Sequence, residues 1–270
     1  MNRSITVGAL LLGCLLTTSP AHAQGAGMDP TQLIQAPGKL PLGPEAKVGL
    51  GMHRTIDAGG QKATERWAIV GETEDAWQVE MQTAAMGFMK QMIPDMDEYM
   101  IGATVDKKTG EVKQAVLGKK GEKGKSIQVQ DMADGQTPGE LPEGEPTEVE
   151  LGFGDKIKAK KVEVQGSTAW IGTEGEFEGV LLKAEGEGQE GFELAGKPTQ
   201  EKVQVNGQEV EVTKLSYTNE MKQWLTQQPA VRAFAPTSKE GERGMFKLEA
   251  PGITMEVTEV TTEAKPQLTW

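Results

Sequence analysis

The chain has 270 residues and a formal net charge of −12, from 40 acidic and 28 basic residues. This balance argues against nucleic-acid binding, which needs a basic stripe to neutralise phosphates, and against electrostatic attachment to anionic lipid. Hydrophobic residues make up 37% of the chain and aromatic residues 5%, so we expect a thin core spread over sheets rather than a thick helical core.

The first 23 residues have the pattern of a secretory signal. A positively charged start is followed by an apolar run over 5–16, and Ala21 and Ala23 are small residues suited to cleavage after Ala23. We therefore expect an exported protein, periplasmic or extracellular. The alternative is a lipoprotein cleavage box that ends at Cys14, which would anchor the protein to a membrane. No later apolar run is long enough to predict a transmembrane segment.

The residue types that follow the signal limit the available chemistry. After residue 23 the chain has no Cys, and its only His is His53. This excludes Cys nucleophiles and Cys-based zinc sites, and any Ser–His–Asp triad would have to use His53. Three acids at Asp95, Asp97 and Glu98 offer oxygen ligands for Ca²⁺, but they are typical of a solvated turn. We predict no metal, no cofactor and no enzymatic activity.

Residues 24–46 are rich in Gly, Pro, Ala and Gln and predict a flexible leader. Apolar and polar residues then alternate with period two, which predicts two series of strands over 47–133 and 147–270. Between them, the acidic Pro- and Gly-rich stretch at 134–146 predicts a linker.

The predicted elements follow one another at short intervals. Strands of the first series are expected at 47–57, 65–71, 76–83, 99–106, 111–117 and 126–130. Strands of the second series are expected at 147–153, 157–165, 168–173, 177–184, 190–194, 202–205, 209–217, 244–249 and 253–260. Asn206-Gly207 predicts a tight hairpin turn. Residues 84–93 and 218–225 have apolar residues at helical spacing, so both predict short helices.

A strand, a Trp and a Gly-apolar-Lys strand occur twice in the second series. The first copy comprises 158–164, Trp170 and 179–183, and the second comprises 209–215, Trp224 and 244–248. Such an echo indicates a repeated strand meander. The predicted fold class is mainly β, with a curved antiparallel sheet of half-barrel or sandwich type and one or two short helices.

After the secretory signal, three stretches carry a resemblance to a known class. They are the hairpin with Trp67-Ala68-Ile69-Val70 and Trp77-Gln78-Val79-Glu80, the stretch 99–106, and the segment from Trp170 to Lys183. Their pattern resembles bacterial periplasmic half-barrel proteins of the lipoprotein-carrier type and their uncharacterised relatives. The resemblance concerns architecture, without a diagnostic motif. It implies a strongly curved sheet that wraps around apolar ligands or helices.

Methionines are unusually dense between residues 81 and 100. On a helix, Met86, Met89 and Met92 would share one face, and their flexible, polarizable side chains adapt to apolar shapes. Such a face is open to three interpretations: a lid over a lipid-sized cavity, a thioether site for Cu(I), or ordinary core packing. Copper is disfavoured because no supporting His or Cys accompanies the cluster.

We expect a binding protein that holds an apolar ligand (a lipid or a lipidated partner) or an envelope protein partner against a curved sheet. The candidate ligand-binding residues are Met86, Met89, Met92, Trp67, Trp77 and Trp170. The alternative is a structural or interaction module of the bacterial envelope or cell surface without a small-molecule ligand. The first hypothesis needs an apolar cavity, whereas the second predicts a concave face filled by the protein's own side chains. The sequence leaves the oligomeric state open.

Overall fold

The structure is a computed structural model that describes residues 29–90, 93, 95–130, 143–154, 156–164, 166–186, 189–235 and 243–269. The predicted secretory signal, Met92 and most of the predicted linker at 134–146 lie outside the described residues.

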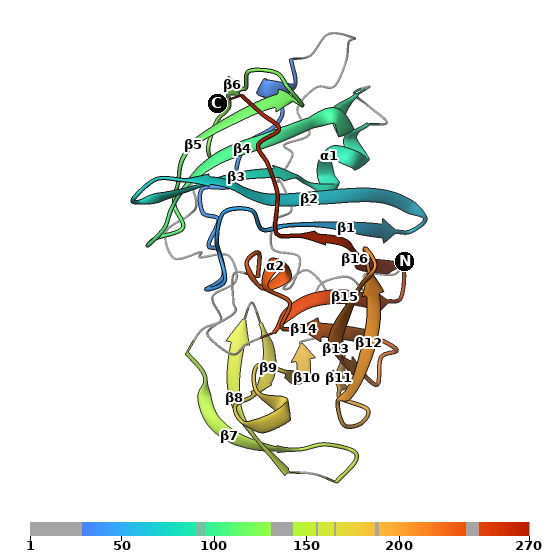
Figure 1. The fold of residues 1–270 in the computed structure, drawn as a ribbon. Coiled ribbons are helices and arrows are strands. Elements are labelled where there is room, and N and C mark those ends of the chain that lie inside the picture. The colour runs from blue at the N-terminus through green and yellow to red at the C-terminus, as the bar shows by residue number, and fades with distance from the viewer. Residues whose placement is uncertain are drawn as a thin grey trace.

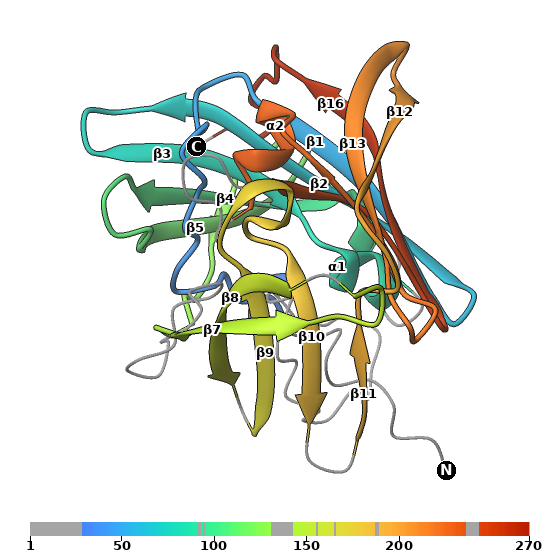
Figure 2. The same ribbon diagram turned by 90° about the horizontal axis from the view of Figure 1, so that it is seen from below.

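The strands form two antiparallel sheets, which confirms the predicted fold class (Figure 1). In the 11-stranded sheet the order is β12-β13-β14-β15-β16-β1-β2-β3-β4-β5-β6, and in the 5-stranded sheet it is β11-β10-β9-β8-β7. Figure 2 shows the smaller sheet in front of the larger one. The strands of the larger sheet are β1 (Gly51–Ala58), β2 (Gln61–Glu72), β3 (Ala76–Gln82), β4 (Tyr99–Asp106), β5 (Val112–Lys119), β6 (Lys125–Ser126), β12 (Thr199–Val205), β13 (Gln208–Ser216), β14 (Lys222–Thr226), β15 (Gly244–Ala250) and β16 (Ile253–Thr261). Those of the smaller sheet are β7 (Glu145–Glu150), β8 (Lys156–Val164), β9 (Ser167–Gly172), β10 (Leu181–Gly186) and β11 (Gln189–Glu193).

Short helices interrupt the strands, as the sequence predicted. The α-helices are α1 (Ala84–Met89) and α2 (Pro229–Arg232), and the 3₁₀ turns are η2 (Pro30–Gln32), η3 (Met96–Glu98) and η4 (Gly175–Phe177). The helix α1 confirms the first part of the helix predicted at 84–93, whereas α2 was not predicted.

The helix predicted at 218–225 is wrong, because Lys222–Thr226 is the strand β14. Trp224 pairs with Lys214 on β13 and with Lys247 on β15. Apolar spacing over eight residues is too short to decide between a helix and a strand. Hydrogen bonding to strands on both sides decides it here.

The larger sheet joins strands from both predicted series. The strand β16 pairs with β1, so that Val260 lies opposite Met52 and the last strand of the chain lies beside the first. The chain passes from the larger sheet to the smaller one between β6 and β7, and it returns to the larger one between β11 and β12, within the second series. The first of these passages falls at the predicted linker over 134–146, whereas the second series contributes strands to both sheets.

The predicted leader is packed in its described part rather than free. Ile34, Ala36 and Leu40 are buried in the hydrophobic core. The backbone N–H of Ala36 donates to the carbonyl of Gln128 at 2.9 Å, and that of Leu40 donates to the carbonyl of Gly110 at 2.7 Å. A segment without apolar periodicity can still be held in one position when single apolar side chains are buried in a hydrophobic core.

The core consists mainly of two hydrophobic clusters. The first cluster includes a cross-strand row over β16, β1, β2, β3, β4 and β5, formed by Val260, Met52, Trp67, Met81, Ile101 and Leu117. The second cluster joins the two sheets, because it contains Ile56 and Ala63 of the larger sheet together with Val149 and Ile157 of the smaller one.

The meanders β7–β11 and β12–β16 repeat one another in register, as the sequence echo indicated. In the first meander, Trp170 lies between Lys161 and Lys183 on the neighbouring strands. In the second meander, Trp224 lies in the same way between Lys214 and Lys247. The next cross-strand pairs also correspond, with Ala184 opposite Phe192 in the first meander and Leu248 opposite Met255 in the second.

A strand irregularity recurs at the same place in both meanders. The register shifts between Leu181 and Lys183 on β10, and Leu182 is the extra residue. On β15 the residue before Lys247 is the extra one, Phe246. Leu182 is 0% exposed and Phe246 is 1% exposed, so both bulges direct an apolar side chain into the core. A shared bulge marks the two meanders as copies of one structural unit.

Gly172 ends β9 against the backbone of η4. A Cβ at this position would lie 2.1 Å from the carbonyl oxygen of Phe177, whereas a Cβ at Gly196 would meet nothing within 4 Å. We expect Gly172→Ala to lower the free energy of unfolding by about 1–3 kcal/mol, because the carbonyl must move. Gly196→Ala is the matched control and should leave it nearly unchanged. Urea unfolding of both variants checks this, and equal midpoints would contradict the close packing.

Candidate functional site

The structure brings together four of the residues predicted to bind a ligand and separates the fifth described one. Those that lie in or against the first cluster are Trp67, Trp77, Met86 and Met89. Trp170 instead packs against the second cluster, on the smaller sheet. Met92 lies outside the described residues. The candidate ligand-binding residues therefore do not converge on one place.

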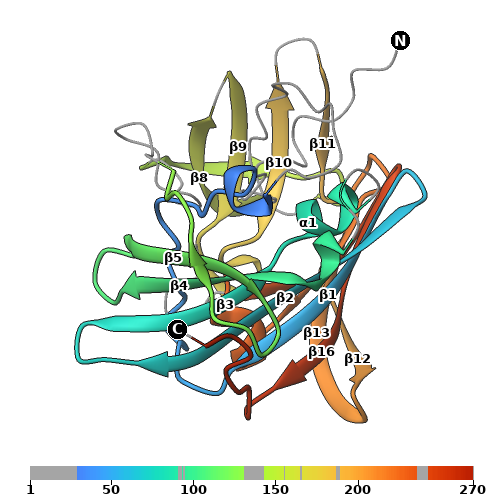
Figure 3. The ribbon, with the colours of Figure 1, turned by 90° about the horizontal axis from the view of Figure 1, so that it is seen from above.

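The Met-rich helix α1 is seated closely on β2 (Figure 3). The backbone N–H of Ala84 donates to the Glu65 carboxylate at 3.1 Å. A Cβ added to Gly87 would lie 3.0 Å from the Ala63 Cβ, so the glycine permits this close approach. Met86 is 0% exposed and Met89 is 8% exposed. This burial favours core packing over an open lid.

The apolar face of the larger sheet is covered by separate parts of the chain. Ile34 from the leader, Met86 from α1 and Val231 from α2 all belong to the first cluster. The Trp67 ring lies 6.1 Å from the Phe234 ring, which follows α2. The chain's own side chains thus fill space that an apolar ligand would otherwise occupy.

Two buried polar atoms under this cover have no hydrogen-bond partner within the described part of the chain. They are the Trp67 indole Nε1 and the Thr83 hydroxyl Oγ1. Trp67 is 6% exposed and Thr83 is 4% exposed. Buried polar groups without partners are uncommon, and a bound molecule with an acceptor group would satisfy them.

Glu80 on β3 is a fully buried carboxylate that holds the C-terminal segment. Its oxygens accept hydrogen bonds from the backbone N–H of Gln267, at 2.8 and 2.9 Å, and of Leu268, at 2.8 Å. The Arg66 Nη1 lies 3.5 Å from the same carboxylate. Figure 1 shows this last segment, in dark red, running from β16 across the larger sheet toward β5 and β6. The Glu80 carboxylate therefore has a structural role.

Glu65, the other buried acid, is also engaged by the chain. Its carboxylate pairs with Arg54 Nε and accepts the N–H of Ala84 at the start of α1. Both carboxylates are thus occupied by backbone N–H groups and a guanidinium.

His53 on β1 faces Glu259 on β16 across the strand pair, with Nδ1 and Oε2 3.2 Å apart. Burial lowers the pKa of His53, Glu259 raises it, and Arg66 lowers it. We expect an NMR titration midpoint below the ordinary value of 6.5, because the burial effect dominates. The signal is assigned with His53→Gln. Glu259→Gln should move the midpoint further down.

The sign of the stability effect follows from this direction. Because the unfolded chain binds the proton more readily, the His53 contribution to stability is present above pH 6.5 and declines as the pH falls below it. A midpoint above 6.5 would show instead that the Glu259 charge dominates.

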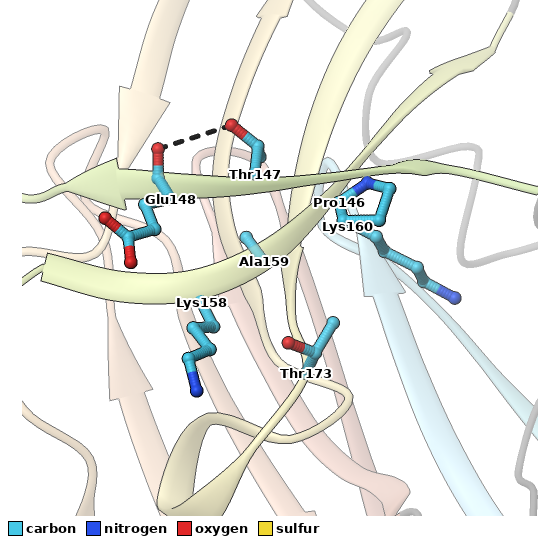
Figure 4. Close-up of a pocket in the computed structure, with 7 residues that line it drawn as sticks. All are labelled: Pro146, Thr147, Glu148, Lys158, Ala159, Lys160 and Thr173. Atoms are coloured by element: carbon cyan, nitrogen blue, oxygen red, sulfur yellow. Dashed lines mark hydrogen bonds between the residues drawn. The ribbon is translucent and has the colours of Figure 1, made fainter.

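A surface groove of about 530 Å³ lies over β7 and β8, and none of the predicted ligand-binding residues lines it (Figure 4). It is lined by Pro146, Thr147, Glu148, Lys158, Ala159, Lys160 and Thr173. Lys158 Nζ lies 3.0 Å from the Glu174 carboxylate beside it. The groove presents charged side chains on an edge of the smaller sheet and differs from an enclosed apolar cavity.

The tryptophans of the two meanders carry lysine ammonium groups over their rings. Lys183 Nζ lies 5.4 Å from the Trp170 ring centre, and Lys247 Nζ lies 5.0 Å from that of Trp224. Lys214 Nζ also lies 5.4 Å from the Trp224 ring centre. Distances of this size are typical of cation–π contacts. Sequence reasoning found the echo of strand, Trp and Lys but did not identify these contacts.

No helix in the described ranges is both long and apolar enough to cross a membrane. Those residues also contain no group of three or more His, Cys, Asp or Glu placed to hold a metal ion. Comparisons with protein-family models, with curated proteins and with solved structures found no match, so the resemblance to periplasmic half-barrel proteins stays a prediction.

Proposed function

We propose that this chain is an exported, non-enzymatic binding protein that engages a protein partner as an interaction module of the bacterial envelope or cell surface. The filled apolar face of the larger sheet carries the proposal. Residues from the leader, α1 and α2 occupy this face together. A partner would then meet the outer surfaces of the sheets, where charged side chains such as Lys158 and Glu148 lie.

The buried ionisable groups support a non-enzymatic role. Glu80 and Glu65 are engaged by backbone N–H groups and arginines, and His53 pairs with Glu259 at the surface. A catalytic acid or base must lie within hydrogen-bond reach of the substrate proton that it transfers. These groups instead hold the C-terminal segment, α1 and the β1–β16 pair.

Binding of an apolar ligand is the second candidate function. The unpartnered Nε1 of Trp67 lies in the same cluster as Met86 and Met89 of the short helix α1. Displacement of α1 would open this cluster to a ligand whose acceptor group could bond the indole N–H. The flexible methionines would adapt to its apolar part.

Three measurements on the full chain, exported from a bacterial host, separate the two functions. Native mass spectrometry without detergent should show the protein with no lipid bound, and an apolar fluorescent probe should not bind saturably. Co-purified lipid or one-to-one probe binding would favour the second candidate. Photo-crosslinkers placed at Lys158, which is exposed, should give a discrete adduct with one partner in intact cells, whereas the buried control position Leu40 should give none. Failure of both positions to crosslink would count against a partner on this surface.

A further inference from the structure

The second meander contains a carboxylate held by a tryptophan and a lysine. Trp224 Nε1 donates to Glu201 Oε2 at 3.0 Å, and Lys214 Nζ lies 3.1 Å from Glu201 Oε1. Lys247 covers the Trp224 ring from the next strand. The hydrogen bond from Trp224, followed by that from Lys214, lowers the pKa of Glu201. Glu201 is thus bound as an anion.

The first meander keeps the tryptophan and both lysines but lacks the carboxylate. Because the two meanders are in register, the position of Glu201 can be assigned from its strand partner. Glu201 lies opposite Val212, two residues before Lys214. The corresponding residue is Thr147, opposite Ala159, which is two residues before Lys161. A threonine hydroxyl therefore stands where the second meander has a carboxylate.

The ion pairs around the two tryptophans differ in the partner of one lysine: Lys214 pairs with Glu201, whereas Lys161 pairs with Glu163. Lys183 pairs with Glu185 at 2.7 Å, as Lys247 pairs with Glu249 at 3.0 Å, so these pairs correspond. Lys161 pairs with Glu163 at 3.2 Å, and the Glu163 side chain is 71% exposed.

An exposed pair of this kind contributes little, so the Lys161 ammonium can exchange its partner at small cost. Two other acidic residues, Glu193 and Glu145, lie on strands next to Lys183 and Lys161. Glu193 beside Lys183 already accepts the N–H of Gly152 at 3.2 Å. Glu145 lies opposite Lys161 on the edge strand β7.

We propose that Trp170, Lys161 and Lys183 form a binding site for a carboxylate of a ligand, which takes the place that the Glu201 carboxylate has in the second meander. The inference rests on the proposed binding function, and it specifies a carboxylate as the group of the ligand or partner that this site recognises. The indole N–H and the Lys161 ammonium would both donate to the anion, and hydrogen bonds to an ionised acceptor are the strong ones. Within the described residues, no hydrogen bond from the Trp170 indole N–H to an acceptor is found. A free organic acid and an acidic side chain of a partner both supply this chemistry.

The test follows the Trp170 indole N–H by NMR in the full chain, with the signal assigned through Trp170→Phe. Titration with N-acetyl-L-glutamate or with poly-L-glutamate should shift this signal saturably, and N-acetyl-L-glutamine should not. If both acids bind, a free organic acid is sufficient as the ligand. If only poly-L-glutamate binds, the carboxylate comes from an acidic side chain of a polypeptide. No shift with either acid would overturn the inference.

Substitutions at position 147 supply the matched control. Thr147→Glu should reproduce the closed arrangement of the second meander, shift the Trp170 signal without added acid and weaken binding by about tenfold or more. Thr147→Gln, of similar size but neutral, should bind nearly as the natural chain does. Conversely, Glu201→Thr should make the Trp224 indole signal respond to the acids. Equal binding by the Glu and Gln variants would contradict the site, whereas the crosslinking at Lys158 tests the proposed function independently.

Discussion

Replacement of Glu80 with alanine should lower the free energy of unfolding by about 3–5 kcal/mol, the range measured when one partner of a buried ionic contact is removed. The Glu80 side chain is 0% exposed. Its loss leaves the N–H groups of Gln267 and Leu268 without their acceptor. It also leaves the Arg66 guanidinium without the carboxylate that it faces. The C-terminal segment should detach as a consequence.

Two variants separate the charge from the hydrogen bonds. Glu80→Gln keeps one acceptor oxygen, so we expect a smaller loss than with alanine. Removal of residues 265–270 should cost a similar amount to Glu80→Ala, because it leaves the carboxylate buried without its donors and uncovers Met100 and Val116, the companions of Leu268 in a small cluster. Urea unfolding gives the free energies, and hydrogen exchange of the Gln267 and Leu268 amides reports detachment. A change below about 1 kcal/mol, the size of a surface effect, would contradict the structural role of Glu80.

Replacement of Met86 with serine should cost about 2–5 kcal/mol, the range for truncation of a buried methionine. Met86 is 0% exposed and belongs to the first cluster. Because domains are stable by only about 5–15 kcal/mol, the combined change of Met86 and Met89 to serine should unfold much of the protein at ordinary temperature. This outcome is expected from packing and not from a mobile lid.

The control variant is Met245→Ser, because Met245 is only partly buried and packs against the other cluster. It should cost less than Met86→Ser when both are compared by thermal unfolding. If Met86→Ser instead leaves stability nearly unchanged and removes binding of an apolar probe, α1 acts as a lid and the second candidate function is favoured.

Local pattern and turn chemistry were sufficient for the hairpins. The strand predicted at 99–106 has the same bounds as β4, because alternation sets a period and Gly110, with φ of 70°, supplies the left-handed turn that follows. Asn206 and Gly207 adopt φ values of 54° and 75°, as the predicted tight turn requires. The repeat was also visible in the sequence, since a strand, a Trp and a Gly-apolar-Lys strand recur in both copies.

Pairing between distant residues could not be inferred in this way. The strand β14 replaces a predicted helix because β13 and β15 lie on either side of it. Ile34 is buried because the sheet beneath it offers an apolar surface, and Glu80 meets Leu268 because β16, β1, β2 and β3 lie side by side.

By itself, then, the sequence determined what depends on neighbours along the chain: the mainly β class, the turns, one short helix and the repeated meander. The tertiary structure decided what depends on contacts across it: the joining of β16 to β1, the burial of Met86 and the correspondence of Thr147 with Glu201. The physical reason is that period and turn chemistry act within a few residues, whereas register and burial depend on which distant strand supplies the hydrogen bonds and the apolar surface.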